Sequence, residues 1–140
     1  MNAFVHTNIL LDALLRREPH FASSTKIWSL ADDGTIKGYV SAISFNNVYY
    51  LMRRQENRIR ARESLRLINA AFTVVSLDNS ILEKSIRSTI DDFEDAIQYF
   101  SALQVSAKCL ITRNSGHFPK KGIAIISPEQ FLKQNIQITD

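Results

Sequence analysis

The sequence contains few of the residues that mark disulfide-bonded, fibrous or disordered proteins. Its 140 residues include one cysteine, four glycines and three prolines, which excludes an internal disulfide and argues against a fibrous repeat or a disordered chain. Because Cys109 lies within an apolar run, we expect it to be a small buried hydrophobe without a lowered thiol pKa. We expect a single domain over residues 1–140.

A membrane span and a secretory signal are also missing. The most apolar stretch, residues 3–15, is interrupted by polar side chains, whereas a membrane helix needs about 18 uninterrupted apolar residues. The N-terminus has no basic segment followed by an apolar segment and a cleavage site. We therefore predict a cytoplasmic protein with no membrane partner.

The net charge is small, but the charges are unevenly distributed. Seventeen Lys and Arg against 14 Asp and Glu give a net charge of +3, which by itself does not demand a polyanionic partner. Between Arg53 and Arg66 the chain has six arginines and two glutamates, whereas acidic residues crowd into positions 91–95. The arginines could form a phosphate-binding face or a solvated helix face paired with glutamates, and the sequence leaves both interpretations open.

Short apolar runs alternate with segments of helical periodicity. Strands are predicted at residues 3–5, 36–40, 72–76, 109–112 and 123–126. Helices are predicted from a cap at Thr7 or Asn8, over residues 21–30, 43–52, 59–71, 78–86 and 92–105, and from residue 128 onward. This order predicts an α/β fold with a mainly parallel sheet and helices on both faces.

The same pattern predicts which residues are buried. The runs at 109–112 and 123–126 are continuously apolar, which is typical of strands covered on both faces. Ile59 is expected on the buried face of its helix, and Phe93 is expected on the same side of its helix as Ile97.

Polar residues follow the predicted strands, at the edge of the sheet where ligands bind in folds of this kind. They are His6, Thr7 and Asn8 after the first strand, Ser41 after the second, residues 76–78 after the third, and Arg113 and Asn114 after the fourth. His6 could be a ligand or an acid–base group, or a hydrogen-bonded packing residue. His20 and His117 are expected to lie in solvent-exposed turns.

The acidic residues at positions 91–95 have two interpretations. Asp92 and Asp95, three residues apart, share one face of a helix and could hold a divalent cation through oxygen ligands. Acidic residues at a helix N-terminus are also favoured by the unpaired backbone N–H groups and by the helix dipole. The spacing alone therefore does not identify a metal site.

Several segments occur together in a recognisable order. They are FVHTNILLD (4–12), VSAIS (40–44) leading to NNVYYL (46–51), DFEDAIQY (92–99), LITRN (110–114) with Phe118, and IISPEQFL (125–132). In order and spacing they resemble the PIN-domain family, the metal-dependent nucleases that include the toxins of VapBC-type toxin–antitoxin pairs. The resemblance covers nearly the whole chain. It implies a three-layer α/β/α sandwich with a central, mainly parallel sheet, homodimers, Mg²⁺ or Mn²⁺ as cofactor, and single-stranded RNA as substrate.

The resemblance also assigns the positions of a site in which acidic residues hold one or two cations that activate water. These positions fall on His6, Asn47, Asp92, Asp95, Asn114 and His117. His6 stands where the family has its first aspartate, and Asn47 stands where it has a helix glutamate. Since Mg²⁺ prefers hard oxygen ligands, His6 is expected to lower its affinity. A mixed set of His6, Asp92, Asp95 and His117 would suit Mn²⁺, Zn²⁺ or Ni²⁺ better.

The first hypothesis is a PIN-type, metal-dependent endoribonuclease acting on single-stranded RNA, the toxin of a toxin–antitoxin pair with an antitoxin as partner. In it Asp95 and Asp92 are the catalytic residues that hold the cation, and Thr7 and Ser41 support the site by hydrogen bonds. The residues expected to bind RNA phosphates are Arg113, Arg53, Arg54, Arg58 and Arg62.

Two other hypotheses use a similar fold. One is a degenerate domain that binds RNA or a protein partner without cleavage, and the changes at His6 and Asn47 favour it. His6 could be a natural or an introduced change that silences a toxic nuclease. The other is a receiver-like signalling domain, which ranks last because no acidic residue follows a predicted strand to accept a phosphate.

Overall fold

The computed structural model describes residues 1–139, in which strands and helices alternate. The elements are β1 (Asn2–Val5), α1 (Thr7–Leu14), α2 (Phe21–Asp32), β2 (Lys37–Ser41), α3 (Ala42–Gln55), α4 (Arg58–Ala71), β3 (Thr73–Val75), α5 (Asn79–Arg87), α6 (Phe93–Gln104), β4 (Cys109–Ile111), the 3-10 helix η1 (Ser115–His117), β5 (Ala124–Ile126) and α7 (Pro128–Thr139). Each predicted strand and helix is present, with ends that differ from the prediction by a few residues. No helix of this described part is long and apolar enough to cross a membrane.

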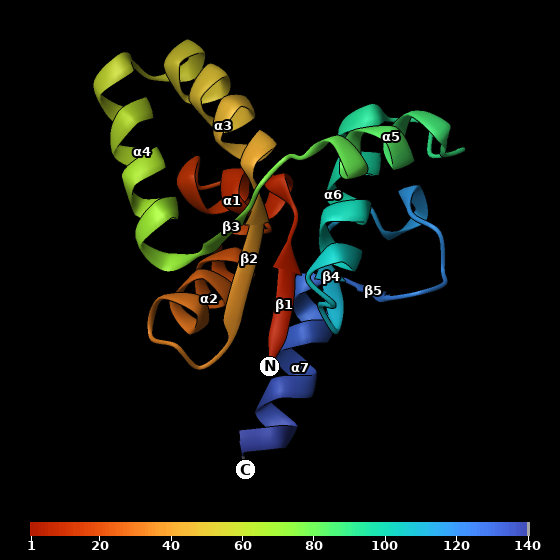
Figure 1. Cartoon of the computed structure of the whole chain (residues 1–140). Coiled ribbons are helices and arrows are strands. Elements are labelled where there is room, and N and C mark those ends of the chain that lie inside the picture. The colour runs from red at the N-terminus through yellow and green to blue at the C-terminus, as the bar shows by residue number, and fades with distance from the viewer. Residues whose placement is uncertain (140) are drawn as a thin grey trace.

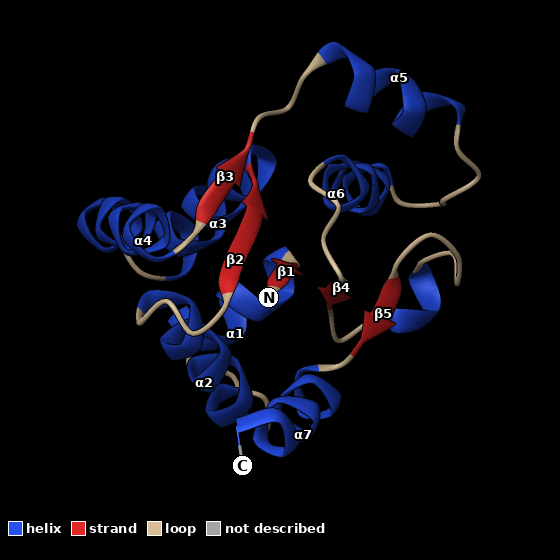
Figure 2. Ribbon diagram, turned by 60° about the horizontal axis from the view of Figure 1, so that its bottom comes forward, coloured by secondary structure: helices blue, strands red, loops and turns tan. Residues whose placement is uncertain are grey.

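The strands form one parallel sheet in the order β3-β2-β1-β4-β5. In its centre, Phe4 pairs in register with Tyr39 of β2 and Leu110 of β4. Helices α1 to α4 and α7 cover one face of the sheet, and α5 and α6 cover the other (Figures 1 and 2). The predicted three-layer α/β/α sandwich with a parallel sheet is therefore confirmed.

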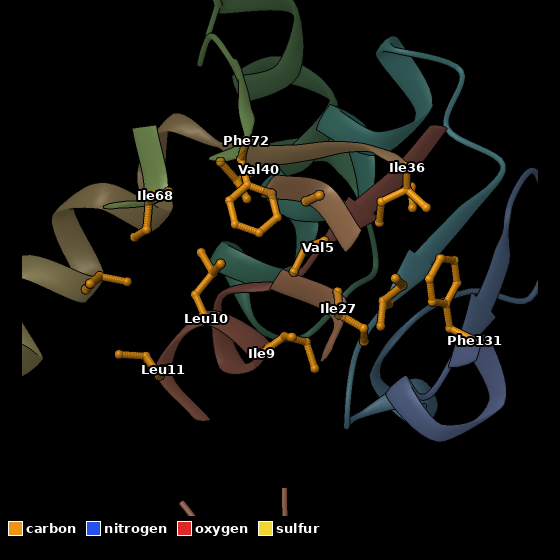
Figure 3. Close-up of a cluster of buried hydrophobic side chains, with 14 of the residues drawn as sticks. Val5, Ile9, Leu10, Leu11, Ile27, Ile36, Val40, Ile68, Phe72 and Phe131 are labelled. Atoms are coloured by element: carbon orange, nitrogen blue, oxygen red, sulfur yellow. The ribbon is translucent and has the colours of Figure 1, made fainter. Parts of the chain in front are cut away.

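The sheet separates two clusters of buried apolar side chains. Because side chains alternate along a strand, Ala3 and Val5 face one cluster and Phe4 faces the other. Figure 3 shows the larger cluster, in which Val5 lies among side chains from α1, α2 and α4. Burying each large side chain of this kind stabilises the fold by roughly 1.5–3 kcal/mol. Cys109 belongs to this cluster, and burial raises the pKa of its thiol to about 12.

Four details of the prediction are wrong. The N-cap of α1 is His6, whose Nδ1 accepts a hydrogen bond from the Asn8 N–H at 3.3 Å, not Thr7 or Asn8. Strand β5 is half-exposed because it lies at the edge of the sheet and pairs only with β4. Ile59 is 81% exposed because it lies in the first turn of α4, at the tip of the α3–α4 hairpin (Figure 1). Phe93 is 48% exposed because it is the first residue of α6.

Candidate active site

Three side chains meet at the carboxyl edge of the sheet. His6 directly follows β1, Asp95 lies in the first turn of α6, and His117 belongs to η1 after β4. His6 Nε2 lies 2.8 Å from Asp95 Oδ1, and His117 Nδ1 lies 3.3 Å from Asp95 Oδ2. The side chains of His6 and Asp95 are almost fully buried, whereas the side chain of His117 is 58% exposed. Each oxygen of the Asp95 carboxylate therefore has an imidazole nitrogen as its partner.

The contacts of His6 determine which of its nitrogens carries the proton. Nδ1 accepts the Asn8 N–H at the start of α1, so Nε2 carries the hydrogen and donates it to Asp95. The Phe118 ring packs edge-on against the imidazole, with 5.6 Å between ring centroids. His6 is thus held by α1, α6 and the segment after η1, and it offers no free lone pair to a cation.

The pKa of Asp95 reflects opposing effects. Burial raises the pKa of this carboxyl group, but hydrogen bonds and electrostatic interactions with His6 and His117 outweigh burial and lower the pKa below that of an ordinary aspartate. Asp95 is consequently ionised at neutral pH, and its two oxygens lie against the two imidazoles.

This lowered pKa predicts a loss of stability in acid. A carboxyl group with a lower pKa in the folded state stabilises that state above its unfolded pKa, and the contribution disappears as the pH falls through the folded pKa. The unfolding free energy of the wild type should therefore decrease relative to that of Asp95→Asn as the pH falls below 3.8. Urea denaturation of both proteins between about pH 5 and pH 3 measures this difference. A difference that stays constant over that range would contradict the prediction.

A buried polar network lies beside the Asp95 site. Thr7 Oγ1 is 2.7 Å from Ser44 Oγ, and Gln98 Nε2 donates to both oxygens, at 2.8 and 3.0 Å. Sequence reasoning included Thr7 but missed Ser44 and Gln98. Gln98 follows Asp95 by three residues on the same side of α6, and this spacing could have revealed it. The network joins α1, α3 and α6 and so fixes the positions of His6 and Asp95.

The other predicted site residues have different local environments in this structure. Asp92 is the N-cap of α6, and its Oδ1 accepts the backbone N–H of Asp95 at 2.9 Å. Ser41 caps α3 in the same way, through the N–H of Ile43. Asn114 donates its backbone N–H to Thr112 Oγ1 at 3.1 Å. Asn47 Nδ2 is buried and has no hydrogen-bond partner among the described residues.

Arg113 forms an ion pair next to the site. Its Nη2 donates to Asp12 Oδ1 at 3.1 Å, and its Nε donates to Asp12 Oδ2. Asp12 is completely buried, and Arg17 Nη1 lies 3.7 Å from its Oδ1. Arg113 therefore links the end of β4 to α1, and two of its N–H donor groups already bind Asp12 within the protein.

Hollows open on both sides of the three-residue cluster. One of about 550 Å³ is lined by His6 together with Asn47, Tyr49, Tyr50, Arg53 and Glu94. The other, of about 440 Å³, is lined by Asp92, Asp95, His117 and Phe118 among others. A polar ligand could thus approach His6 from one side and Asp95 from the other.

Several solved structures resemble this fold. One is VapBC2 from Rickettsia felis bound to a promoter DNA fragment, with a TM-score of 0.69, 14% identity, and coverage of 91% of this chain and 98% of that chain. A toxin–antitoxin complex from Klebsiella pneumoniae has a TM-score of 0.66, 23% identity, and coverage of 90% and 97%. VapC20 from Mycobacterium tuberculosis, described as a sarcin–ricin loop cleaving toxin, has a TM-score of 0.63, 12% identity, and coverage of 77% and 86%. At these identities the similarity shows the shared fold.

Sequence comparison identifies the family. No curated protein matches the chain. A family model described as the PIN domain matches residues 2–116. This match extends from the first strand through His6 and Asp95 and ends within η1, and the protein therefore belongs to the PIN-domain family.

Proposed function

We propose that this chain is a toxin-type PIN protein that binds single-stranded RNA, and that its metal-dependent endoribonuclease activity is impaired by His6. Membership of the PIN-domain family and the similar toxin structures support the toxin type. The proposal that the activity is impaired rests on one observation: both oxygens of Asp95 accept hydrogen bonds from imidazoles.

The residues around Asp95 do not fit the Mg²⁺ centre that the family implies. Mg²⁺ requires near-octahedral coordination by oxygen ligands, but His6 replaces a carboxylate with an N–H donor. Asp92 Oδ1 is already occupied as the cap of α6. Among the described residues, no group of three or more His, Cys, Asp and Glu side chains is arranged to hold a metal ion. The same contacts argue against the mixed nitrogen and oxygen site for Mn²⁺, Zn²⁺ or Ni²⁺.

The chain's own residues can bind RNA without a cation. Arg53 is exposed and lines the same hollow as His6, so its guanidinium can pair with a phosphate there. His117 presents its exposed ring beside the other hollow. Asp95 holds both imidazoles in place, which makes it a positioning residue in this proposal.

A second candidate is an endoribonuclease that is active as it stands. The ionised Asp95 favours it, as does the similarity to VapC20, which is described as a cleaving toxin. Asp95, Asp92, Asn47 and Asn114 would then be the residues that carry catalysis.

One experiment separates the two candidates. A labelled, mixed-sequence single-stranded RNA is incubated with the wild type and with Asp95→Asn, in EDTA, Mg²⁺ or Mn²⁺. We expect RNA binding that changes less than about twofold with EDTA, and cleavage by the wild type no greater than by Asp95→Asn. Metal-dependent cleavage by the wild type alone would establish the second candidate. Absence of RNA binding in all conditions would refute the proposal that the chain binds RNA.

The proposal includes an antitoxin partner and a homodimer. Both rest on family resemblance, and the similar structures include a VapBC complex and a toxin–antitoxin complex. Light scattering of the purified chain tests the dimer, and co-purification with the product of a neighbouring small gene tests the antitoxin.

A further inference from the structure

The α3–α4 hairpin carries a regular row of arginines on one side. Arg58, Arg62 and Arg66 occur at every fourth position of α4 and are all exposed. Four residues of an α-helix advance about 6 Å along its axis, which is comparable to the separation of neighbouring phosphates along an extended single strand. We call these three residues the arginine track.

The guanidinium groups of the arginine track are available to a ligand. Arg60, which lies on another side of α4, pairs with Glu56 at 4.0 Å and Glu63 at 3.5 Å. In the described part of the chain, no ion pair involves a residue of the arginine track. Arg62 lies 6.0 Å from the centre of the Tyr49 ring, and this cation–π contact orients the guanidinium while leaving its N–H donors free.

Two hollows follow the seam between α3 and α4. One, of about 400 Å³, is lined by Tyr49, Ile59 and the arginine track. The next, of about 370 Å³, shares Arg62 and Arg66 with the first. Tyr49 also lines the hollow that contains His6. Tyr49 therefore joins the seam to the Asp95 site, and Figure 1 shows α3 leading away from that edge of the sheet and α4 running back beside α3.

An exposed aromatic ring lies in the hollow that contains His6, next in sequence to Tyr49. Tyr50 is 60% exposed and lines the hollow that contains His6. Exposed aromatic rings beside a positive groove stack with the bases of single-stranded nucleic acids. A peptide helix would instead require a continuous row of apolar contacts, whereas the arginine track interrupts the apolar lining of the seam, which consists of Phe45, Tyr49, Ile59 and Leu65. The surface therefore favours RNA over an acidic peptide.

We propose that the arginine track binds three consecutive phosphates of a single-stranded RNA, and that this strand continues past Tyr50 into the hollow at His6. The inference rests on the proposed function and specifies the path of the RNA on the protein. It selects Arg58, Arg62 and Arg66 from the predicted arginine-rich segment between Arg53 and Arg66, and it adds Tyr50 as a stacking residue.

The test compares two variants that lose the same charge. R58Q/R62Q/R66Q removes the arginine track, and K84Q/R87Q/K133Q removes three exposed cations from α5 and α7. Binding of a fluorescein-labelled 12-nucleotide RNA is followed by anisotropy at several KCl concentrations. Loss of three phosphate contacts should reduce the slope of log affinity against log salt by about 2, because each contact contributes about 0.7. Affinity at low salt should fall at least about tenfold, and the control variant should change less than about twofold.

A second pair of variants tests the aromatic contact. Y50A should weaken RNA binding about fivefold or more at an unchanged salt slope, since it removes stacking but no charge. Y50F should bind like the wild type. Circular dichroism of every variant verifies that the fold is intact.

Several outcomes would overturn the inference. One is an R58Q/R62Q/R66Q variant that binds RNA with the affinity and salt slope of the wild type. The proposed RNA-binding function would then stand, but the arginine track would not be the surface that binds the RNA. Another is that a decaglutamate peptide binds the wild type as tightly as the RNA does and does not bind the R58Q/R62Q/R66Q variant. This result would assign the seam to an acidic partner. A wild type that binds no RNA would refute the proposed function itself.

Discussion

Replacing His6 with aspartate is expected to create a divalent-cation site at Asp95 and to raise cleavage of single-stranded RNA at least about 100-fold over the wild type. The variant places a second carboxylate beside Asp95, where the His6 imidazole now donates a hydrogen bond. Aspartate is also a favoured N-cap, so the start of α1 keeps its side-chain acceptor. The change therefore removes a donor and adds an oxygen ligand without removing the helix cap.

Thermal unfolding provides a readout of His6→Asp that does not depend on catalysis. Two nearly buried carboxylates repel each other, so the variant should unfold at a lower temperature than the wild type in EDTA. A cation that binds only the folded state raises the melting temperature, and the increase grows with the logarithm of the ratio of cation concentration to Kd. We expect Mg²⁺ and Mn²⁺ to stabilise the variant while leaving the melting temperature of the wild type unchanged.

His6→Asn is the matched control, because asparagine caps a helix as well as aspartate does but brings no charge. It should neither respond to Mg²⁺ nor cleave RNA. A His6→Asp protein that behaves like this control in both assays would show that the missing carboxylate is not what silences the site.

Replacing Arg113 with alanine is expected to destabilise the protein by about 3 kcal/mol, because it leaves the completely buried Asp12 with a weaker partner. Arg17 Nη1 lies 3.7 Å from Asp12 Oδ1 and still compensates part of the negative charge of Asp12. In a chain of 140 residues this corresponds to a decrease of about 10 °C in melting temperature. Urea and thermal denaturation measure both quantities.

Two further variants locate the cause of that loss. Arg113→Lys keeps the charge but loses the paired geometry of the guanidinium, so it should fall between the wild type and Arg113→Ala. Adding Asp12→Asn to Arg113→Ala removes the uncompensated charge and should cause no further loss of stability. If the two changes were instead additive, the buried charge of Asp12 would not be the source of the destabilisation.

The elements and their order were predictable from the sequence because they follow from local patterns. The apolar runs at 3–5 and 109–112 and the helical spacing between them depend on neighbours along the chain, and the structure confirms the parallel sheet that they predict. Predictions of burial failed at Ile59 and Phe93. Periodicity places such residues on the apolar side of a helix. It does not show how far along the helix the sheet or the neighbouring helix covers that side.

The sequence by itself determined the positions at which the family resemblance predicts a site, among them His6, Asp95 and His117, since motif and order locate them. Only the tertiary structure decided that both imidazoles bind the carboxylate of Asp95, because His6 and Asp95 are 89 residues apart and meet only when β1 and α6 pack together. It likewise paired Arg113 with Asp12, 101 residues away. Charge and spacing are local properties of a chain, whereas the partner of a buried charge depends on how the layers close around it.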